Sequence, residues 1–430
     1  MKIDTNKLIQ ESYEDFLTSR EKAYLSFFIL LFFVLIFDIV PRDIILTMIT
    51  IVFTISSLKS SSIMYMFFSL WENVAVSTFG LTLNVALKIV LCIKILANLM
   101  KVKPNISLKY LDVLVLLVVG YYGIMNVIVG TGDFSGIEIG CNVLIAIYLF
   151  NIYKDKKEYL MFWKKIFLIL MLSTLLSVLY GIINNTSLNR WISGMGYIPQ
   201  IYGTIGTARI GMFLCASLIY PVFYSTNRLI KIMLSILLSG LALMTLSITT
   251  TICLLLFWTV VLAFKEKKGH IGLRVPVAII FILITIILLG PKIKEISLVK
   301  PIIIRIENII KAFKAGDMHV ATSSRFTLLN KYISDFKELP VINKVFGSFY
   351  VNRVTFSPTG QYAHNSYVDI LLYSGIIGLV SFILVLVKKI RFHRNKSEFL
   401  PIMLLKLIFL ITGLSVSMLT STFWFLWLIL

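Results

Sequence analysis

The sequence predicts an all-α polytopic membrane protein with about 12–14 transmembrane helices and one long extracytoplasmic loop containing two amphipathic helices. Hydrophobic residues occupy 58% of the 430 positions and charged residues only 14%, which is more apolar surface than a soluble core of this length can bury. The apolar stretches are also continuous rather than alternating. These observations exclude a soluble domain and a disordered chain, and they disfavour a β-barrel.

A transmembrane helix needs about 20 mostly apolar residues, or fewer when its ends snorkel. The stretches of this kind are 24–40, 44–58, 61–79, 82–99, 111–129, 137–152, 166–183, 210–225, 232–246, 251–264, 275–290, 366–387, 400–414 and 417–430. The number of crossings between residues 41 and 101 and after residue 400 stays open. The chain thus divides into an N-terminal segment (1–23), a helix bundle (24–290), a long loop (291–365) and C-terminal helices (366–430).

The basic residues predict the orientation of these helices. Lys and Arg number 41 against 21 Asp and Glu, a net charge of +20. Cytoplasmic loops of membrane proteins are enriched in Lys and Arg. With 14 crossings and both termini in the cytoplasm, all five basic clusters fall on the cytoplasmic side: residues 101–103, 154–165, 228–231, 265–274 and 388–396.

The long outer loop departs from this rule, because residues 291–363 hold 11 Lys or Arg against 5 Asp or Glu. A helical apolar stripe within it comprises Ile302, Ile306, Ile309, Ile310 and Phe313. A second helix is expected to start at Ser323 or Ser324 and to stop before Pro340, with Phe326, Leu329, Ile333 and Phe336 as its stripe. Such helices lie at the lipid interface or cover a cavity.

Several polar residues flank the membrane on this outer side. His364 stands where the long loop returns to the membrane, and there it is either an amphipathic anchor or a general base. Asp369 lies just inside the next span, as a functional carboxylate or a buried ion-pair partner. Arg209 ends an outer loop and Arg325 opens the second loop helix, where a guanidinium beside a helix N-terminus suits a phosphate or diphosphate.

These features together resemble a known family. Arg209-Ile210-Gly211 follows a glycine-rich loop, Ser324-Arg325 starts a loop helix, and Val345-Phe346-Gly347 follows that helix. His364-Asn365-Ser366-Tyr367 then precedes Gly375 and Gly378, which are expected to lie near one helix face. The set resembles the superfamily of O-antigen ligases and Wzy-type polysaccharide polymerases, most closely over residues 323–387. The Asn that often follows Arg-x-Gly in the family is absent here, as is the Trp that is common after the loop-helix Arg.

The resemblance implies a metal-independent, inverting glycosyltransferase at the outer face of a bacterial plasma membrane, with undecaprenyl-diphosphate-linked glycan as donor and no cofactor. Arg209 and Arg325 would bind the diphosphate, and His364 would be the general base. Asn365, Tyr367, Asp369, Arg305 and Arg353 are expected to bind substrate. Partners implied by the family are a flippase and a chain-length regulator, besides membrane lipid. No nucleic-acid partner and no metal site are expected.

Three functions remain open on the sequence. The first is a polymerase of O-antigen, capsule or exopolysaccharide repeat units, which is the preferred interpretation. The second is a ligase that transfers finished glycan to another acceptor. The third, of a different class, is a lipid-linked oligosaccharide flippase. A flippase predicts charges along a path through the membrane, whereas the polar set here clusters outside. This distribution favours an enzyme.

Overall fold

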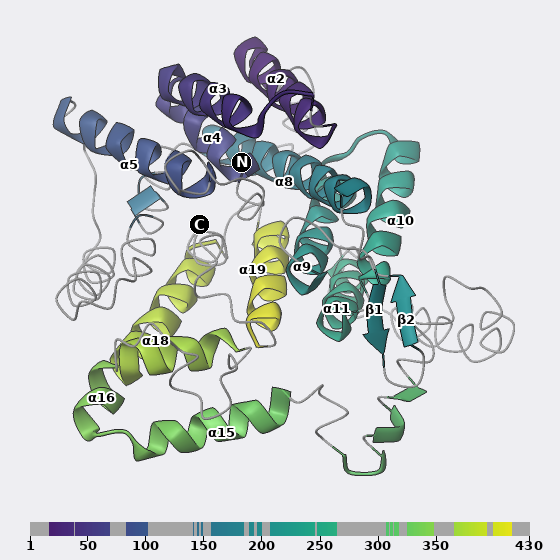
Figure 1. The fold of residues 1–430 in the computed structure, drawn as a ribbon, viewed down its shortest axis with the longest axis vertical. Coiled ribbons are helices and arrows are strands. Elements are labelled where there is room, and N and C mark those ends of the chain that lie inside the picture. Colours follow the sequence, from purple (N-terminus) through teal and green to yellow (C-terminus); the bar gives the residue numbers. More distant parts are fainter. Residues whose placement is uncertain are drawn as a thin grey trace, which may run out of the picture.

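The computed structural model describes residues 17–68 except 38, 83–101, 156–184, 189–192, 196–199, 207–264 except 246, 307–317 except 309 and 313, 325–347, 365–393 and 399–414, together with residues 141, 144, 145 and 148. Within these residues the fold is mostly helical, as the sequence predicts (Figure 1). The expected spans 111–129, 275–290 and 417–430 lie outside the described residues, as does most of 137–152.

The helices follow the predicted order along the chain. In the first half of the chain they are α2 (Ser19–Ile36), α3 (Arg42–Ile55), α4 (Leu58–Phe68), α5 (Leu83–Lys101) and α8 (Lys156–Asn184). In the second half they are α9 (Thr207–Ser217), η1 (Tyr220–Tyr224), α10 (Arg228–Met244), α11 (Ile248–Phe264), α15 (Arg325–Glu338), α16 (Val341–Phe346), α18 (Ser366–His393) and α19 (Phe399–Gly413).

A short pair of antiparallel strands is the one departure from an all-helical fold in the described ranges. β1 (Asn189–Ile192) pairs with β2 (Gly196–Pro199), and Trp191 is opposite Tyr197. The hairpin lies in the outer loop that the sequence places after α8. Its residues include aromatic and β-branched types, which favour extended backbone.

One described helix is long and apolar enough to cross a membrane. It is the segment Met161–Ile183 of α8, 23 residues in length. Shorter apolar helices occur at Asp43–Ile55, Arg209–Tyr224, Thr249–Leu262, Ser374–Leu384 and Phe399–Gly413.

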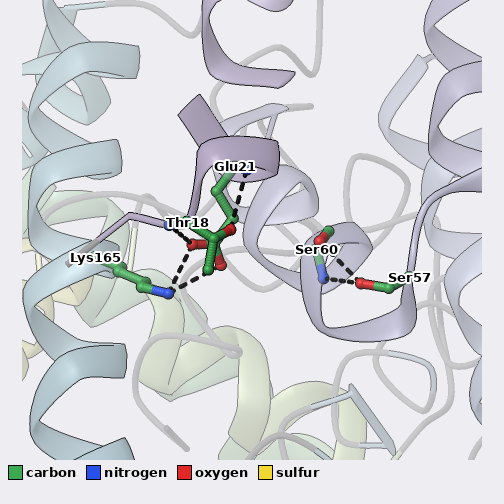
Figure 2. A network of polar contacts seen from close by, with 5 residues as sticks. All are labelled: Thr18, Glu21, Ser57, Ser60 and Lys165. Atoms are coloured by element: carbon green, nitrogen blue, oxygen red, sulfur yellow. Dashed lines mark hydrogen bonds and ion pairs between the residues drawn. The ribbon is translucent and has the colours of Figure 1, made fainter. Parts of the chain in front are cut away.

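The N-terminal helices pack against α8 through apolar side chains and a partly buried ion pair. Thr18 and Glu21 form a reciprocal capping box at the start of α2, in which each backbone N–H donates to the other side chain (Figure 2). Lys165 Nζ donates to both carboxylate oxygens of Glu21, at 2.9 and 2.8 Å. The start of α2 is thereby fixed to the basic end of α8.

The centre of the molecule is made by α9, α11 and α19, beside α8 and α10 (Figure 1). The side chains between them are mostly apolar, and Phe213 of α9 meets Phe409 of α19 edge to face with ring centroids 5.6 Å apart. After α9 the helix widens into the π-turn η1 at Pro221, where Ser225 N–H donates to the Tyr220 carbonyl. Asn227 then caps α10 by accepting from Leu229 and Ile230 N–H groups.

The remaining described helices of the long loop pack on α18. α15 lies along the lower edge of the molecule in Figure 1, and α16 stands at the left edge beside α18. Tyr332 of α15 is buried with Val368 and Leu372 of α18, and Leu329 and Phe336 complete this cluster. The start of α15 at Arg325 and its end before Pro340 agree with the predicted helix.

Candidate functional site

The start of α9, the start of α11 and the end of α19 meet at one end of the three central helices. Gly211, in the second turn of α9, lies so close to α11 that an added Cβ would be 2.0 Å from Thr250 Oγ1. Cys253 Sγ of α11 lies 3.7 Å from Thr412 Oγ1, near the end of α19. The beginning of α9, with Arg209, is therefore level with the beginning of α11 and the end of α19. Arg209 itself is half-buried.

The beginning of α18 joins the same end. Asn365 Nδ2 donates to the carbonyl of Leu414, the residue after α19, at 3.2 Å. Its Oδ1 accepts the Tyr367 and Val368 N–H groups at 3.0 and 3.2 Å, so Asn365 is the N-cap of α18. Tyr367 Oη donates to the Leu410 carbonyl at 2.9 Å. Residue 364 thus directly precedes a cap that is fixed to α19.

The basic residues Lys164, Lys165 and Arg228 lie at the opposite end. The ring of Phe167 stacks on that of Tyr224, with centroids 5.7 Å apart. Phe167 follows Lys165 by two residues in α8, and Tyr224 precedes Arg228 by four. At the end of α9, Ser217 donates to Thr174 near the middle of α8. α8 and the helical stretch formed by α9 and η1 are therefore antiparallel, so Lys165 and Arg228 lie near one end of this pair and Arg209 lies at the other. The C-terminal ends of α11 and α18, after which two of the remaining basic segments follow in the sequence, are likewise the ends remote from Thr250 and Asn365.

α18 is kinked at Gly375, and the end of α16 contacts it there. This residue has φ 66° and ψ −169°, a conformation that is essentially restricted to glycine, inside the helix that spans Ser366–His393. A Cβ there would lie 2.3 Å from the Val345 carbonyl oxygen and 2.5 Å from Gly347 N. The end of α16 is therefore in direct contact with the kink. The expectation that Gly375 and Gly378 share one continuous helix face is wrong, because the helix breaks at Gly375.

Figure 1 shows α15 running from the side of α19 toward α16, in the same direction as the first part of α18. Because the two helices pack side by side through Tyr332, Val368 and Leu372, their N-terminal ends lie on the same side of this pair. Arg325 is the first residue of α15 and Ser366 is the first residue of α18. The structure thereby places the Arg325 backbone on the side of the α18 cap.

The predicted site residues divide into three groups. One group lies at the end of the central helices where α9, α11 and α18 begin. It comprises Arg209, Asn365, Tyr367 and the backbone of Arg325. Asp369 is buried, with 2% exposure, one turn into α18, and its N–H donates to the Asn365 carbonyl. His364, Arg305 and Arg353 lie outside the described residues, as does the Arg325 side chain.

Sequence reasoning missed two polar residues near these helices. Thr250 is buried against Gly211, and its Oγ1 has no hydrogen-bond partner among the described residues. Asp335 of α15 also has a buried carboxylate oxygen without a described partner, and burial raises the pKa of this carboxyl, an effect that Lys331 partly offsets. The position of Asp335, three residues after Tyr332 and beside Phe336 of the apolar stripe, is the signal that could have revealed it.

The arrangement favours binding of an anion. Helices α9, α11 and α18 all begin at this end, and the dipole of a helix gives its N-terminus a partial positive charge, even where a side chain such as Asn365 already accepts two of the N–H groups. Arg209 adds a full positive charge there. Among the described residues, no three His, Cys, Asp or Glu side chains gather as they would around a metal ion.

Comparison with protein-family models found none that matches this chain, and a search of curated proteins found no match either.

Proposed function

We propose that the protein is a multi-pass membrane glycosyltransferase that polymerises polysaccharide repeat units at the outer face of a bacterial plasma membrane. Its donor is an undecaprenyl-diphosphate-linked glycan, and its acceptor is the next lipid-linked repeat unit. The observation that carries the proposal is the gathering of the starts of α9, α15 and α18 at one end of the helices, away from Lys165 and Arg228.

The outer surface of the helices supports the membrane setting. Beyond Arg228, the large exposed side chains of α10 are Leu229, Ile230, Ile232, Met233, Ile236 and Leu237, whereas its buried residues are Ser235, Leu238 and Ala242. The exposed face thus carries more large apolar side chains than the buried one, unlike a typical water-soluble helix. α18 repeats this pattern beyond its kink, where Ile376, Ile377, Val380, Ile383 and Leu384 are exposed. Such faces fit lipid as solvent.

The chemistry follows from the charges at the outer end. His364 takes the proton from an acceptor sugar hydroxyl, and the hydroxyl oxygen attacks the anomeric carbon on the face opposite the diphosphate. The bond between that carbon and the phosphate oxygen breaks, so the configuration inverts and undecaprenyl diphosphate leaves. Arg209, Arg325 and the helix N-termini stabilise the negative charge that develops on the leaving group. Diphosphate is already a good leaving group, so this set of residues suffices.

The test is deletion of the gene followed by sizing of the glycans on the lipid carrier. We expect single repeat units to accumulate on the carrier at the outer face, with long chains lost. Long lipid-linked chains that persist but stay unattached to their final acceptor would instead identify a ligase. Single units confined to the cytoplasmic face would identify a flippase.

Point variants test the site itself. We expect His364→Ala, Arg325→Ala and Arg209→Ala to abolish long chains while the protein is still made. Arg228→Ala is the matched control, because Arg228 is an exposed arginine that also lies at a helix start, but at the opposite end of the molecule. Near-normal chain length in any of the three site variants would remove that residue from the site.

A further inference from the structure

We propose that the bend between α15 and α16 inserts into the outer leaflet of the lipid bilayer. This apolar elbow consists of Ile333, Val341, Ile342 and Phe346, whose side chains are all exposed. Val341 and Ile342 are 75% and 66% exposed, which is unfavourable in water for neighbouring large apolar residues. The inference rests on the proposed function, since it requires that these helices lie at the outer face of a membrane.

The elbow is held in place from its inner side. The end of α16 contacts the kink at Gly375, and α15 is fixed to α18 by the cluster around Tyr332. These contacts use the inward faces of both helices. The elbow residues are the large apolar side chains left exposed on these two helices, which lie at the edge of the molecule (Figure 1). A segment anchored in this way presents its apolar side chains without rearrangement.

Lipid is the occupant that fits this surface because of what lies next to it. The exposed apolar face of α18 begins at Ile376, immediately after the kink that α16 contacts. The elbow and the lipid-facing side of α18 are therefore neighbours at the point where the chain enters the membrane. Lys337 and Lys344 flank the elbow, and their long stems allow the ammonium groups to remain among the headgroups while the apolar residues insert.

Insertion of the elbow gives α15 a fixed depth. With its C-terminal end anchored in the leaflet and the cluster around Tyr332 packed on α18, α15 holds its start at Arg325 at the height of the headgroups. This is the height at which the diphosphate of a polyprenyl-linked donor lies, because its tail remains in the hydrocarbon. The elbow would therefore set the level of the phosphate-binding arginine relative to the lipid donor.

The experiment measures depth in the membrane on the full chain. Spin labels are placed on Ile342→Cys in the elbow, Ser334→Cys on the exposed polar side of α15, and Ile383→Cys on the exposed face of α18. The proteins are reconstituted in nanodiscs of phosphatidylethanolamine and phosphatidylglycerol. Collision with oxygen, which concentrates in lipid, is compared with collision with a water-soluble nickel chelate. The parent chain is labelled in parallel to subtract the native cysteines, and Val341→Cys replaces I342C if that variant does not fold.

We expect I342C and I383C to collide more with oxygen, and S334C more with the chelate. If I342C prefers the chelate or is shielded from both reagents while I383C prefers oxygen, the elbow lies in water or against protein and the inference is overturned. If S334C also prefers oxygen, insertion is not confined to the elbow and the inference is overturned as well. If I383C prefers the chelate, the membrane setting of the proposed function fails instead.

Discussion

Gly211 offers the sharpest test of how Arg209 is positioned. A Cβ added at this residue would lie 2.0 Å from Thr250 Oγ1, 2.8 Å from its Cγ2 and 2.9 Å from its Cβ. Ordinary contact begins at 3.4 Å, so the first distance is about 1.4 Å too short. Rotation of the threonine does not remove the clash, because its Cβ, which rotation leaves in place, also lies 2.9 Å from the added Cβ. The Gly211→Ala variant must therefore push α9 and α11 apart.

Overpacking of this kind destabilises a protein by about 1–3 kcal/mol. We expect G211A to lower the free energy of unfolding by this amount, and Thr250→Ala to restore most of it, because that change removes the two nearest atoms. Thermal and denaturant unfolding of the purified full chain in detergent measures both effects. Gly240→Ala in α10 is the matched control: nothing lies within 4 Å of its added Cβ, so helix propensity alone predicts a gain of about 0.5–1 kcal/mol.

Two results would refute this reasoning. If G211A proved as stable as G240A, α9 and α11 would not be in contact at Gly211. If T250A failed to recover the stability lost in G211A, the clash would lie elsewhere. The chain length of the glycan measured on the same variants then shows whether the spacing of the two helices also affects Arg209. In that case G211A shortens the chains and the G211A/T250A pair restores them.

Three further predictions concern stability. Gly375→Ala should lower the free energy of unfolding by about 1–3 kcal/mol in thermal unfolding, since a φ of 66° is strained for alanine and the new Cβ meets α16. Stability equal to that of the parent would argue against the kink. Glu21→Gln should lose about 1–3 kcal/mol by leaving Lys165 without its carboxylate, and adding Lys165→Met should recover part of this. Additive losses in the double-mutant cycle would show that the two charges are not coupled. Because burial raises the pKa of Asp335, the folded protein binds the proton more tightly than the unfolded chain, so the free energy of unfolding falls as pH rises above the ordinary Asp value of about 3.9. Asp335→Asn should therefore be more stable than the parent at pH 7, and the difference should vanish near pH 3. A difference independent of pH would contradict this.

Local signals in the sequence predicted helix positions well. The second loop helix was expected to start after Ser323 or Ser324 and end before Pro340, and α15 spans Arg325–Glu338. Polar N-terminal residues and proline act within a few residues, so a single sequence reveals them. α3, α5, α11 and α19 likewise overlap their predicted stretches.

Features set by distant contacts were not predictable. The expected stripe of α15 included Ile333, yet Ile333 is exposed and Leu328 and Tyr332 are buried instead. The buried face is chosen by packing on Val368 and Leu372 of α18, which a helical period alone cannot locate. The kink has the same origin. Gly375 is identifiable as a glycine, but its positive φ follows from the approach of α16.

The contacts of Asn365 and Tyr367 change the role expected for both residues. Each was predicted to bind substrate, yet the hydrogen-bonding groups of their side chains are already used: the Asn365 amide caps α18 and bonds to Leu414, and the Tyr367 hydroxyl donates to Leu410. A group that binds substrate must leave such bonds or share them. If His364 is the base, the two residues act by fixing the backbone beside it, and they are positioning residues. Loss of the Tyr367 hydroxyl would then weaken the contact between α18 and α19 and lower turnover, with little change in the affinity for donor.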